Sequence, residues 1–246
     1  MYRFYVEQNQ IKENSICILD SDVNHIKNVL RMNRGDTLIA CDGQGKDYIC
    51  SITDLSDKIV ELAIKQVQNS YAELEGRIYL FQGLPKKDKM ELIIQKAVEL
   101  GVYEIIPVMT KRTVVKLEDK KKELKKLERW QAIATSAAKQ SGRGIIPRIA
   151  GTKTLKQALD YGSELDCRFI PYENAEGIEY TKEVIANIQS KHKVGIFIGP
   201  EGGFEEKEIT LAKEAGYQPI TLGKRILRTE TAGLAILSMI MLQMET

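Results

Sequence analysis

Three segments in the second half of the sequence contain residue types that suit the binding of a small organic molecule. They are residues 170–174 (IPYEN), 199–204 (GPEGGF) and 222–228 (LGKRILR). Glycines in the second segment allow positive φ angles and close backbone approach, and its proline stiffens the turn. A flat ligand can lie against such a backbone and hydrogen-bond to its amides. A plain strand-to-helix turn is the alternative interpretation of GPEGG.

The third segment mixes apolar and cationic side chains, a combination that favours a methionine-type cofactor beside an anionic substrate. Leu222, Ile226 and Leu227 supply the apolar wall, and Arg225 and Arg228 supply the cations. The glycine-rich segment matches neither the P-loop pattern nor G-x-G-x-x-G, which disfavours a phosphate-rich cofactor. The four cysteines form no C-x-x-C pair and there are only two histidines, so no metal site is predicted.

The N-terminal region has the texture of a small β-barrel. Short alternating segments predict strands, and DGQG at residues 42–45 predicts a hairpin turn. A short helix is expected from about residue 22 to residue 31. The polar and acidic residues 70–76 mark the boundary of this region. The predicted strands are residues 2–6, 36–42, 47–55 and 58–67.

After residue 76, strands and helices alternate, which predicts an α/β domain with a mostly parallel sheet and helices on both faces. Helices are expected at residues 88–100 and 118–140, between the later strands and after the last one. In such sheets, ligands bind outside the carboxyl ends of the strands, where the three segments above lie. The predicted strands are residues 77–83, 104–109, 167–172, 193–200 and 218–223.

The positive charge is concentrated in one third of the chain. Residues 76–148 contain 17 basic and 8 acidic residues, a net charge of +9, whereas the whole chain carries +2. Such a segment is typical of a polyanion-binding surface. Part of it, residues 116–129, mixes acids with lysines at helical spacing and is interpreted as a solvated helix face. The N-terminus resembles no targeting sequence, and no run reaches the ~20 residues of a membrane span, so we expect a cytoplasmic protein.

The motifs resemble one family along the whole chain. FIGPEGGF at residues 197–204, followed by LGKRILRTETAGLAIL at residues 222–237, closely resembles the RsmE family of 16S rRNA uracil-N3 methyltransferases, which belongs to the SPOUT superfamily. Residues 25–36, 86–101 and 130–143 also resemble segments of that family. The chain departs from many members by having no acidic residue near Ser136 or Lys139, so no carboxylate role is carried over there.

The resemblance implies a fold and a domain organisation that the pattern alone does not give. A PUA-like, RNA-binding β-barrel is expected over residues 1–70, followed by a SPOUT methyltransferase domain over residues 71–246. That domain is expected to contain a C-terminal trefoil knot, although knots are essentially absent under general topology rules. The family also implies a homodimer. The apolar helix predicted at residues 231–244 fits either a subunit interface or the core of one subunit.

The implied activity is S-adenosyl-L-methionine-dependent methylation of N3 of a uridine in 16S rRNA of the small ribosomal subunit. S-adenosyl-L-homocysteine is the expected product, and no metal is expected. The predicted cofactor-binding residues are Ile170, Pro171, Glu173, Ile198, Gly199, Pro200, Gly202, Gly203, Leu222, Gly223, Ile226, Leu227, Thr231 and Ala232.

Four residues are candidates for the catalytic machinery. Arg143 and Arg228 are expected to hold RNA phosphate or the uracil oxygens, with surface salt bridges as the alternative. Glu201 and Glu230 are the candidate proton acceptors, with capping of a helix N-terminus as the alternative for either and at least as strongly favoured for Glu230. The predicted RNA-binding residues are His25, Arg31, Arg34, Lys86, Lys87, Lys89, Lys111 and Arg112. His25 fits a packing role equally well.

Two other functions remain open at this point. A non-catalytic RNA-binding assembly factor predicts degraded cofactor segments, whereas all three are intact here. A SPOUT methyltransferase that acts on another RNA, at a ribose or another base, is the second alternative. The N-terminal barrel and the LGKRILRTETA motif argue against it through resemblance.

Overall fold

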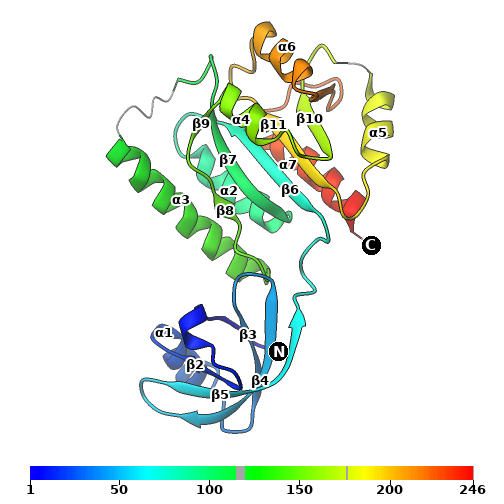
Figure 1. Ribbon diagram of the computed structural model, residues 1–246. Coiled ribbons are helices and arrows are strands. Elements are labelled where there is room, and N and C mark those ends of the chain that lie inside the picture. Colours follow the sequence, from blue (N-terminus) through cyan, green and yellow to red (C-terminus); the bar gives the residue numbers. More distant parts are fainter. Residues whose placement is uncertain (115–119, 176, 246) are drawn as a thin grey trace. The chain divides into compact units, whose positions relative to one another are not determined.

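The computed structural model describes residues 1–114, 120–175 and 177–245, and the chain divides into two compact units (Figure 1). The first unit comprises Met1–Glu73 together with Ala138–Ile146, and the second comprises Leu74–Ala137 and Pro147–Thr246. A boundary near residue 70 was predicted. The return of residues 138–146 to the first unit was not predicted, because it depends on contacts between residues far apart in the sequence.

The first unit is built on a five-stranded sheet with the order β1-β3-β4-β5-β2. Strand β1 pairs parallel with β3, and the other pairs are antiparallel. Alternating apolar residues, such as Leu38 and Ala40 in β3, bury one face of the sheet. The strands are β1 (Arg3–Tyr5), β2 (Ser15–Ile18), β3 (Thr37–Cys41), β4 (Lys46–Leu55) and β5 (Val60–Asn69).

The predicted hairpin at residues 42–45 is confirmed, and its tip anchors the returning segment. Asp42 Oδ1 accepts hydrogen bonds from the backbone amides of Gln44 and Lys46, which closes the turn. Gly45 N donates to Gly144 O at 2.9 Å. An antiparallel bridge joins Gln44 to Ile145. These backbone bonds explain why residues 138–146 belong to the first unit.

Helical turns complete the first unit in a form that differs from the prediction. The expected helix at residues 22–31 consists of one α-helical turn, α1 (Ser21–Asn24), followed by a π-helical turn, η2 (His25–Val29). A 3-10 turn, η1 (Gln8–Gln10), and strand β2 were not predicted. Cys41 and Cys50 are fully buried, as expected for Cys50 and for an unexposed Cys41.

The second unit contains a parallel sheet with the order β12-β10-β11-β6-β7-β8, and β9 pairs with β7. Because every pair is parallel, the carboxyl ends of these strands meet at one edge. The strands are β6 (Arg77–Gly83), β7 (Val102–Met109), β8 (Arg148–Ile149), β9 (Lys153–Thr154), β10 (Cys167–Pro171), β11 (Lys193–Ile198) and β12 (Gln218–Ile220).

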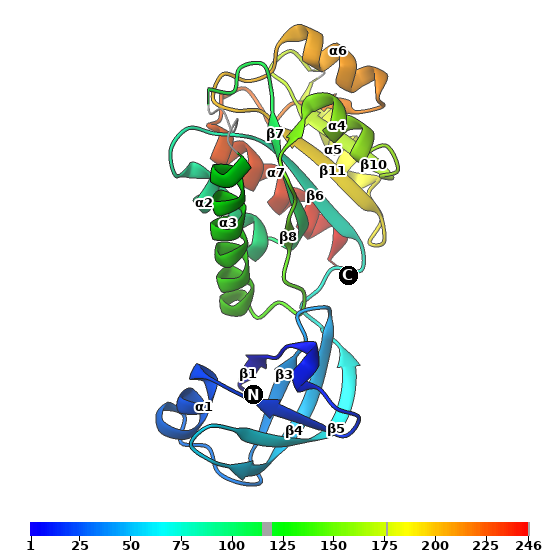
Figure 2. The ribbon, with the colours of Figure 1, turned by 60° about the vertical axis from the view of Figure 1, so that its left-hand side comes forward.

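Helices cover both faces of this sheet, as predicted. Figures 1 and 2 show α2 and α7 on one face and α4 on the other. The rings of Phe81 and Phe197 stack with centroids 4.5 Å apart, and Tyr217 packs edge-on against both. The helices are α2 (Lys89–Glu99), α3 (Lys120–Ser141), α4 (Leu155–Tyr161), α5 (Ile178–Ala186), α6 (Glu206–Glu214) and α7 (Thr229–Met244).

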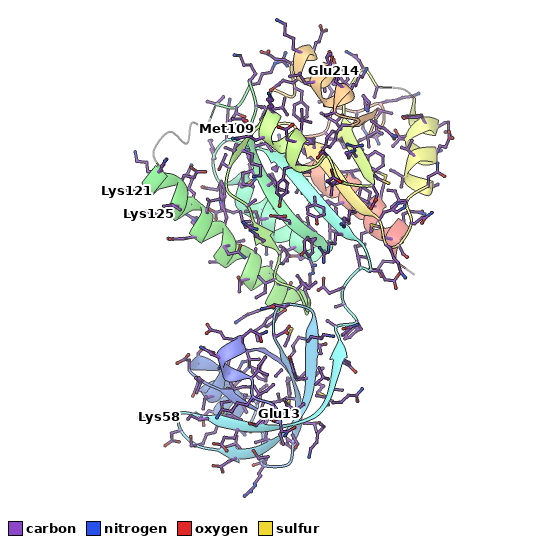
Figure 3. All side chains as sticks on the ribbon, viewed as in Figure 1. Glu13, Lys58, Met109, Lys121, Lys125 and Glu214 are labelled. Atoms are coloured by element: carbon purple, nitrogen blue, oxygen red, sulfur yellow. The ribbon has the colours of Figure 1, made fainter. Side chains whose placement is uncertain are left out.

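The ends of two helices refine the sequence predictions. Helix α2 has Asp88 at its N-cap, but the Asp88 side chain makes no capping hydrogen bond. The expected start of α3 at residue 118 lies outside the described residues. Lys121 and Lys125 project outward from α3, which fits the interpretation of a solvated helix face (Figure 3). Within the described residues, no helix combines the length and apolar character that spanning a bilayer requires.

Helix α7 begins at Thr229, and Arg228 occupies its N-cap position. The helix packs on α2 and β11. An added Cβ at Gly233 would make only ordinary contacts, 3.8 Å from Gln82 Oε1 and from Ile198, so this glycine does not set the distance between α7 and the sheet. The trefoil knot implied by the resemblance stays a prediction.

Candidate active site

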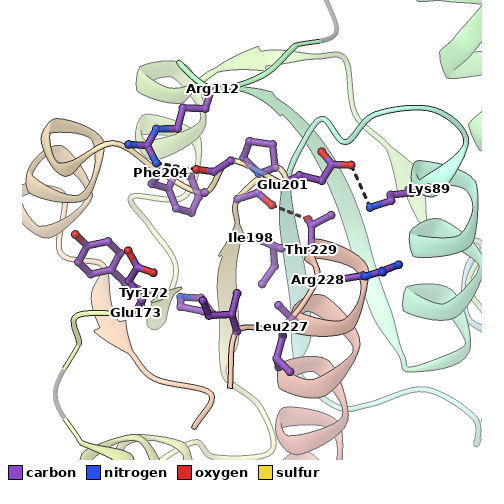
Figure 4. Close-up of a pocket in the computed structure, with 17 residues that line it drawn as sticks. Lys89, Arg112, Tyr172, Glu173, Ile198, Glu201, Phe204, Leu227, Arg228 and Thr229 are labelled. Carbon is purple, nitrogen blue, oxygen red and sulfur yellow. Dashed lines mark hydrogen bonds and ion pairs between the residues drawn. The ribbon is translucent and has the colours of Figure 1, made fainter. Parts of the chain in front are cut away.

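The carboxyl edge of the parallel sheet brings the three predicted segments together around one cavity. Strands β10 and β11 lead into residues 171–173 and 198–204, and the connection after β12 leads through residues 226–228 into α7. The cavity has a volume of about 450 Å³. Figure 4 shows its lining side chains converging from these segments and from the start of α2. The three segments that the sequence singled out therefore line one cavity in the fold.

Most of the predicted cofactor-binding residues lie at this edge. Two of the fourteen, Leu222 and Gly223, line a neighbouring cavity of about 270 Å³ and not the larger one. Ile170 lines neither cavity because it is fully buried in the core, and Thr231 lines neither because it is exposed on α7. The ten that line the larger cavity are Pro171, Glu173, Ile198, Gly199, Pro200, Gly202, Gly203, Ile226, Leu227 and Ala232.

Three lining residues were missed by the sequence prediction. The ring of Tyr172 and the ring of Phe204 line the cavity, and Thr229 lines it at the first turn of α7. Tyr172 and Phe204 stand inside the motifs IPYEN and GPEGGF, so their position next to the predicted residues was the available signal.

The glycines of the GPEGG loop differ in backbone conformation and in how closely they pack against the surrounding chain. Gly203 has a φ angle of 67°, which favours glycine, whereas Gly202 does not adopt a positive φ angle. An added Cβ at Gly199 would lie 3.1 Å from the Cα of Gly203. At Gly83, where β6 ends, an added Cβ would lie 2.7 Å from Pro200 N. The prediction of positive φ was thus wrong for Gly202, and Gly83 supports the loop from a strand end that the sequence did not single out.

Buried hydrogen bonds fix the loop to the first turn of α7. Thr229 Oγ1 donates to Gly199 O at 2.6 Å, and Gln82 Nε2 donates to Thr229 Oγ1 at 3.0 Å. Both Gln82 and Thr229 are buried. This chain joins three segments that are far apart in the sequence, and two of its members line the cavity.

Replacing Thr229 by valine is expected to loosen this connection without changing side-chain volume much. Gly199 O and Gln82 Nε2 would each lose a buried partner, which costs about 1–3 kcal/mol per unsatisfied group. Affinity for the ligand of the cavity should fall together with the melting temperature. Calorimetric ligand titration and thermal unfolding measure the two effects, with Thr210→Val on exposed α6 as the control. Equal behaviour of the two variants would contradict the role of Thr229.

Lys89 places one ammonium group between the two predicted proton acceptors. Its Nζ lies 3.2 Å from Glu201 Oε1 and 3.2 Å from Glu230 Oε2 (Figure 4 shows the contact with Glu201). Glu201 Oε1 also accepts a hydrogen bond from the backbone amide of Lys86 at 3.1 Å. Lys89 and Glu201 line the cavity. The two carboxylates therefore share one ammonium group, and of the two Glu201 lines the cavity.

The cluster keeps Glu201 ionised at neutral pH. Partial burial acts to raise the pKa of Glu201, but hydrogen bonds from backbone amides, including that of Lys86, and from Lys89 outweigh it and lower the pKa. The same contacts, led by the hydrogen bond to Glu201, raise the pKa of Lys89. A carboxylate in this state accepts protons rather than donating them.

Comparison with known proteins identifies the family. A model described as an RNA methyltransferase domain matches residues 72–241, and one described as an RNA methyltransferase PUA domain matches residues 18–65. The ribosomal RNA small subunit methyltransferase E of Bacillus subtilis is 38% identical over 251 residues, which cover 100% of this chain and 98% of the relative. The chain belongs to the ribosomal RNA small subunit methyltransferase E family.

Solved structures agree with this assignment along the whole chain. The methyltransferase E of Neisseria gonorrhoeae, bound to S-adenosyl methionine, is 35% identical with a TM-score of 0.79 and covers 97% of this chain and 95% of that chain. A putative methyltransferase of Legionella pneumophila, in complex with the same cofactor, is 32% identical with a TM-score of 0.77 and covers 97% and 96%. The predicted family, the α/β fold and the PUA-like N-terminal region are therefore confirmed.

Arg143 is not among the residues that line the cavity, and it forms a salt bridge, which was the alternative to its predicted RNA-binding role. Its side chain is 5% exposed and forms an ion pair with Glu73 at 2.6 Å within the first unit. Glu73 Oε1 also accepts hydrogen bonds from the backbone amides of Gly144 and Ile145. A buried guanidinium that is already paired is not available to an RNA phosphate. Among the two arginines predicted for the catalytic machinery, Arg228 lines the cavity.

The predicted RNA-binding residues fall into two groups in this family member. In the first unit, His25, Arg31 and Arg34 are exposed, and the His25 ring packs edge-on against Phe4. In the second unit, Lys86, Lys87, Lys111 and Arg112 are exposed, and Lys89 is held in the carboxylate cluster described above.

Two of these cations also organise the loops of the cavity. Arg112 donates to Gly202 O at 2.7 Å and lines the cavity. The backbone amide of Lys111 donates to Glu208 Oε1 at 2.8 Å, and Glu208 Oε2 accepts from Glu205 N in the capping box of α6. The loop after β7 is thereby fixed to the loop that carries GPEGG.

Proposed function

We propose that this chain transfers a methyl group from S-adenosyl-L-methionine to N3 of a uridine in 16S rRNA of the small ribosomal subunit. The observation that carries the proposal is the pair of Lys89 and Glu201 at the wall of the cavity, with Glu230 held behind them by Lys89. Loss of the imide proton is required before N3 can attack a methyl group, so a proton acceptor must lie next to the methyl donor. The relatives named above support the cofactor and the RNA.

The cavity suits the cofactor chemically. Ile198, Leu227 and Ala232 give it apolar walls for an adenine ring and a thioether chain, and Glu173 offers a carboxylate to hydroxyl or ammonium groups. Gly199, Gly202 and Gly203 place the backbone itself at the wall of the cavity. When bound there, S-adenosyl-L-methionine supplies an electrophilic methyl group on a sulfonium centre.

Residues of the chain would perform the remaining steps. The uridine must be unpaired, because N3–H lies on its Watson–Crick edge. The N3–H bond breaks as a carboxylate, Glu201 or Glu230, accepts the proton, and Lys89 keeps both carboxylates charged and in place. Arg228 lines the same cavity and would stabilise negative charge on the uracil oxygens as the proton leaves.

The cofactor assignment is tested by calorimetric titration with S-adenosyl-L-methionine in the presence of EDTA. Saturable binding near one site per chain is expected. Replacing Gly203 by valine should abolish it, because a β-branched residue is strained at a φ angle of 67°. Absence of binding in the wild-type protein, both alone and with RNA, would instead support a non-catalytic assembly factor.

We also infer a cytoplasmic homodimer, as the resemblance implies. Three apolar side chains on the packed helices α2 and α7 stay exposed in one chain, namely Leu92 at 45%, Met239 at 37% and Leu242 at 74%. Ile240, in contrast, is fully buried within the chain and serves its core. Surface apolar groups on adjacent helices favour an interface between copies.

The dimer is tested at Leu242. Light scattering should give about twice the chain's 27.8 kDa at micromolar concentration. Leu242→Asp is expected to yield folded monomers, because a charge buried without a partner at an interface is costly. Leu211→Asp on α6, where Leu211 is also exposed, is the control and should stay dimeric. A monomeric wild-type protein would refute the inference.

A further inference from the structure

A second cavity lies beside the first turn of α2 and is not used by the function proposed above. It has a volume of about 230 Å³. Its apolar lining comes from Leu84 and Pro85, which follow β6, from Met90 of α2 and from Trp130 of α3. All four residues are buried, so these surfaces are fixed by packing. A rigid apolar floor that contains an indole suits a flat aromatic group, because aromatic surfaces stack on one another.

The polar residues that line this cavity carry more positive than negative charge. Arg129 is paired with Glu91 at 2.7 Å, so these two side chains neutralise one another. Lys87 and Lys126 remain exposed at the cavity against one carboxylate, that of Asp88. The Asp88 carboxylate makes no capping bond to α2 and can accept a hydrogen bond from a ligand. The lining thus combines a stacking floor, cations for phosphate and an acceptor for an amino group.

One short loop separates this cavity from the proposed methyl-transfer site. Lys87 and Asp88 line the second cavity, and the next residue, Lys89, lines the first. The backbone amide of Lys86 is bound by Glu201, which also lines the first cavity. The spacing between the two cavities is therefore set by one loop that is fixed at both of its ends.

We propose that the second cavity binds the base of a nucleotide that neighbours the methylated uridine in the RNA. A single RNA strand that places one unpaired base in the first cavity would continue past the loop that carries Lys87 and Asp88. On that side, Lys87 and Lys126 would contact the phosphates of the strand. The Asp88 carboxylate selects a base with an exocyclic amino group, since carboxylates accept hydrogen bonds from such groups. This inference rests on the proposed function and adds a specificity-determining subsite to it.

The test compares RNA fragments in which one neighbour of the target uridine lacks its base. Methylation is followed with S-adenosyl-L-methionine as kcat/KM for the intact fragment and for fragments abasic on the 5′ or the 3′ side. Removing the base on one side only is expected to lower kcat/KM about tenfold, the size of one lost stacking contact. Asp88→Ala should lower kcat/KM for the intact RNA and have no further effect on that abasic RNA.

Matched variants separate this subsite from general charge effects. Lys126→Ala should lower kcat/KM equally for the intact and the abasic RNA, because Lys126 contacts the RNA backbone and not the base. Asp160→Ala and Lys213→Ala, which alter exposed residues of α4 and α6, should leave kcat/KM unchanged. Cofactor affinity should be the same in every variant. Equal effects of Asp88→Ala on intact and abasic RNA, or equal effects of the two abasic sites, would overturn the proposal. A wild-type protein that methylates no RNA would overturn the proposed function instead.

Discussion

Replacing Lys89 by methionine is expected to lower kcat by about 100-fold or more, with a much smaller change in cofactor affinity. Methionine keeps most of the side-chain length but removes the charge that lies 3.2 Å from both Glu201 and Glu230. Without that charge the two carboxylates repel one another and lose their fixed positions. A proton acceptor that is correctly placed contributes roughly 10²–10⁴-fold to a rate, which sets the size of the expected loss.

The pH dependence of kcat distinguishes this role from a purely structural one. A carboxylate base is active when ionised, so kcat rises with pH through its pKa and then levels off. In the wild type, the bonds that outweigh burial hold the pKa of Glu201 below its usual value. Lys89→Met removes one of those bonds, so the acid limb of the profile should move to higher pH. Lys89→Arg should restore part of kcat and move the limb back.

The control for Lys89 is Lys96→Met on the same helix, which breaks an ion pair with Glu99 away from the cavity. It should leave kcat and the pH profile unchanged. If Lys89→Met lowered only RNA affinity and kept the wild-type kcat at saturating RNA, Lys89 would be an RNA contact, as the sequence first suggested.

Replacing Glu73 by glutamine is expected to cost about 3–5 kcal/mol of stability, the usual effect of breaking a buried ion pair. The Glu73 carboxylate is 12% exposed and pairs with Arg143, whose side chain is 5% exposed. It also accepts from the amides of Gly144 and Ile145, at 2.8 and 3.0 Å. Glutamine would leave a guanidinium buried without its counter-charge, so residues 138–146 should detach from the hairpin of the first unit.

Differential scanning calorimetry measures this loss, and Glu75→Gln is the matched control. The carboxylate of Glu75 accepts one exposed hydrogen bond from Ser190, so its variant should unfold close to the wild-type temperature. Arg143→Met should be as destabilising as Glu73→Gln. If Glu73→Gln and Arg143→Met were both as stable as the wild type but bound RNA more weakly, Arg143 would be an RNA contact, as the sequence suggested.

The sequence was sufficient to single out the segments that line the cavity, because the information it used there is local. Short apolar strands ending in IPYEN, GPEGG and LGKRILR predicted a ligand site at the carboxyl edge of a parallel sheet, and ten of the fourteen predicted cofactor residues line the cavity. The motifs alone could not show which of their residues line the cavity and which only lie next to those residues in the sequence. Ile170 is one residue away from the cavity lining and points into the core, and Thr231 lies on the exposed side of α7.

Contacts between distant residues explain the remaining differences. Arg143 carries a charge in a basic segment, and only the fold shows that Glu73, 70 residues earlier, already binds it. Lys89 belongs to the same basic segment, yet the fold places it between Glu201 and Glu230. In both cases charge counting predicted an RNA contact. Whether a basic side chain is paired with a carboxylate depends on contacts between residues far apart in the sequence. Local sequence patterns do not show such contacts.

Mass spectrometry of 16S rRNA nucleosides after reaction in vitro tests the proposed activity most directly. Small ribosomal subunits from a strain that lacks this gene would be incubated with the purified protein and S-adenosyl-L-methionine carrying a heavy methyl group. One heavy 3-methyluridine per 16S rRNA is expected, and the Lys89→Met protein should form it at least about 100 times more slowly. Heavy label on a ribose or on another base, or no label in the RNA at all, would contradict N3 methylation of a 16S rRNA uridine.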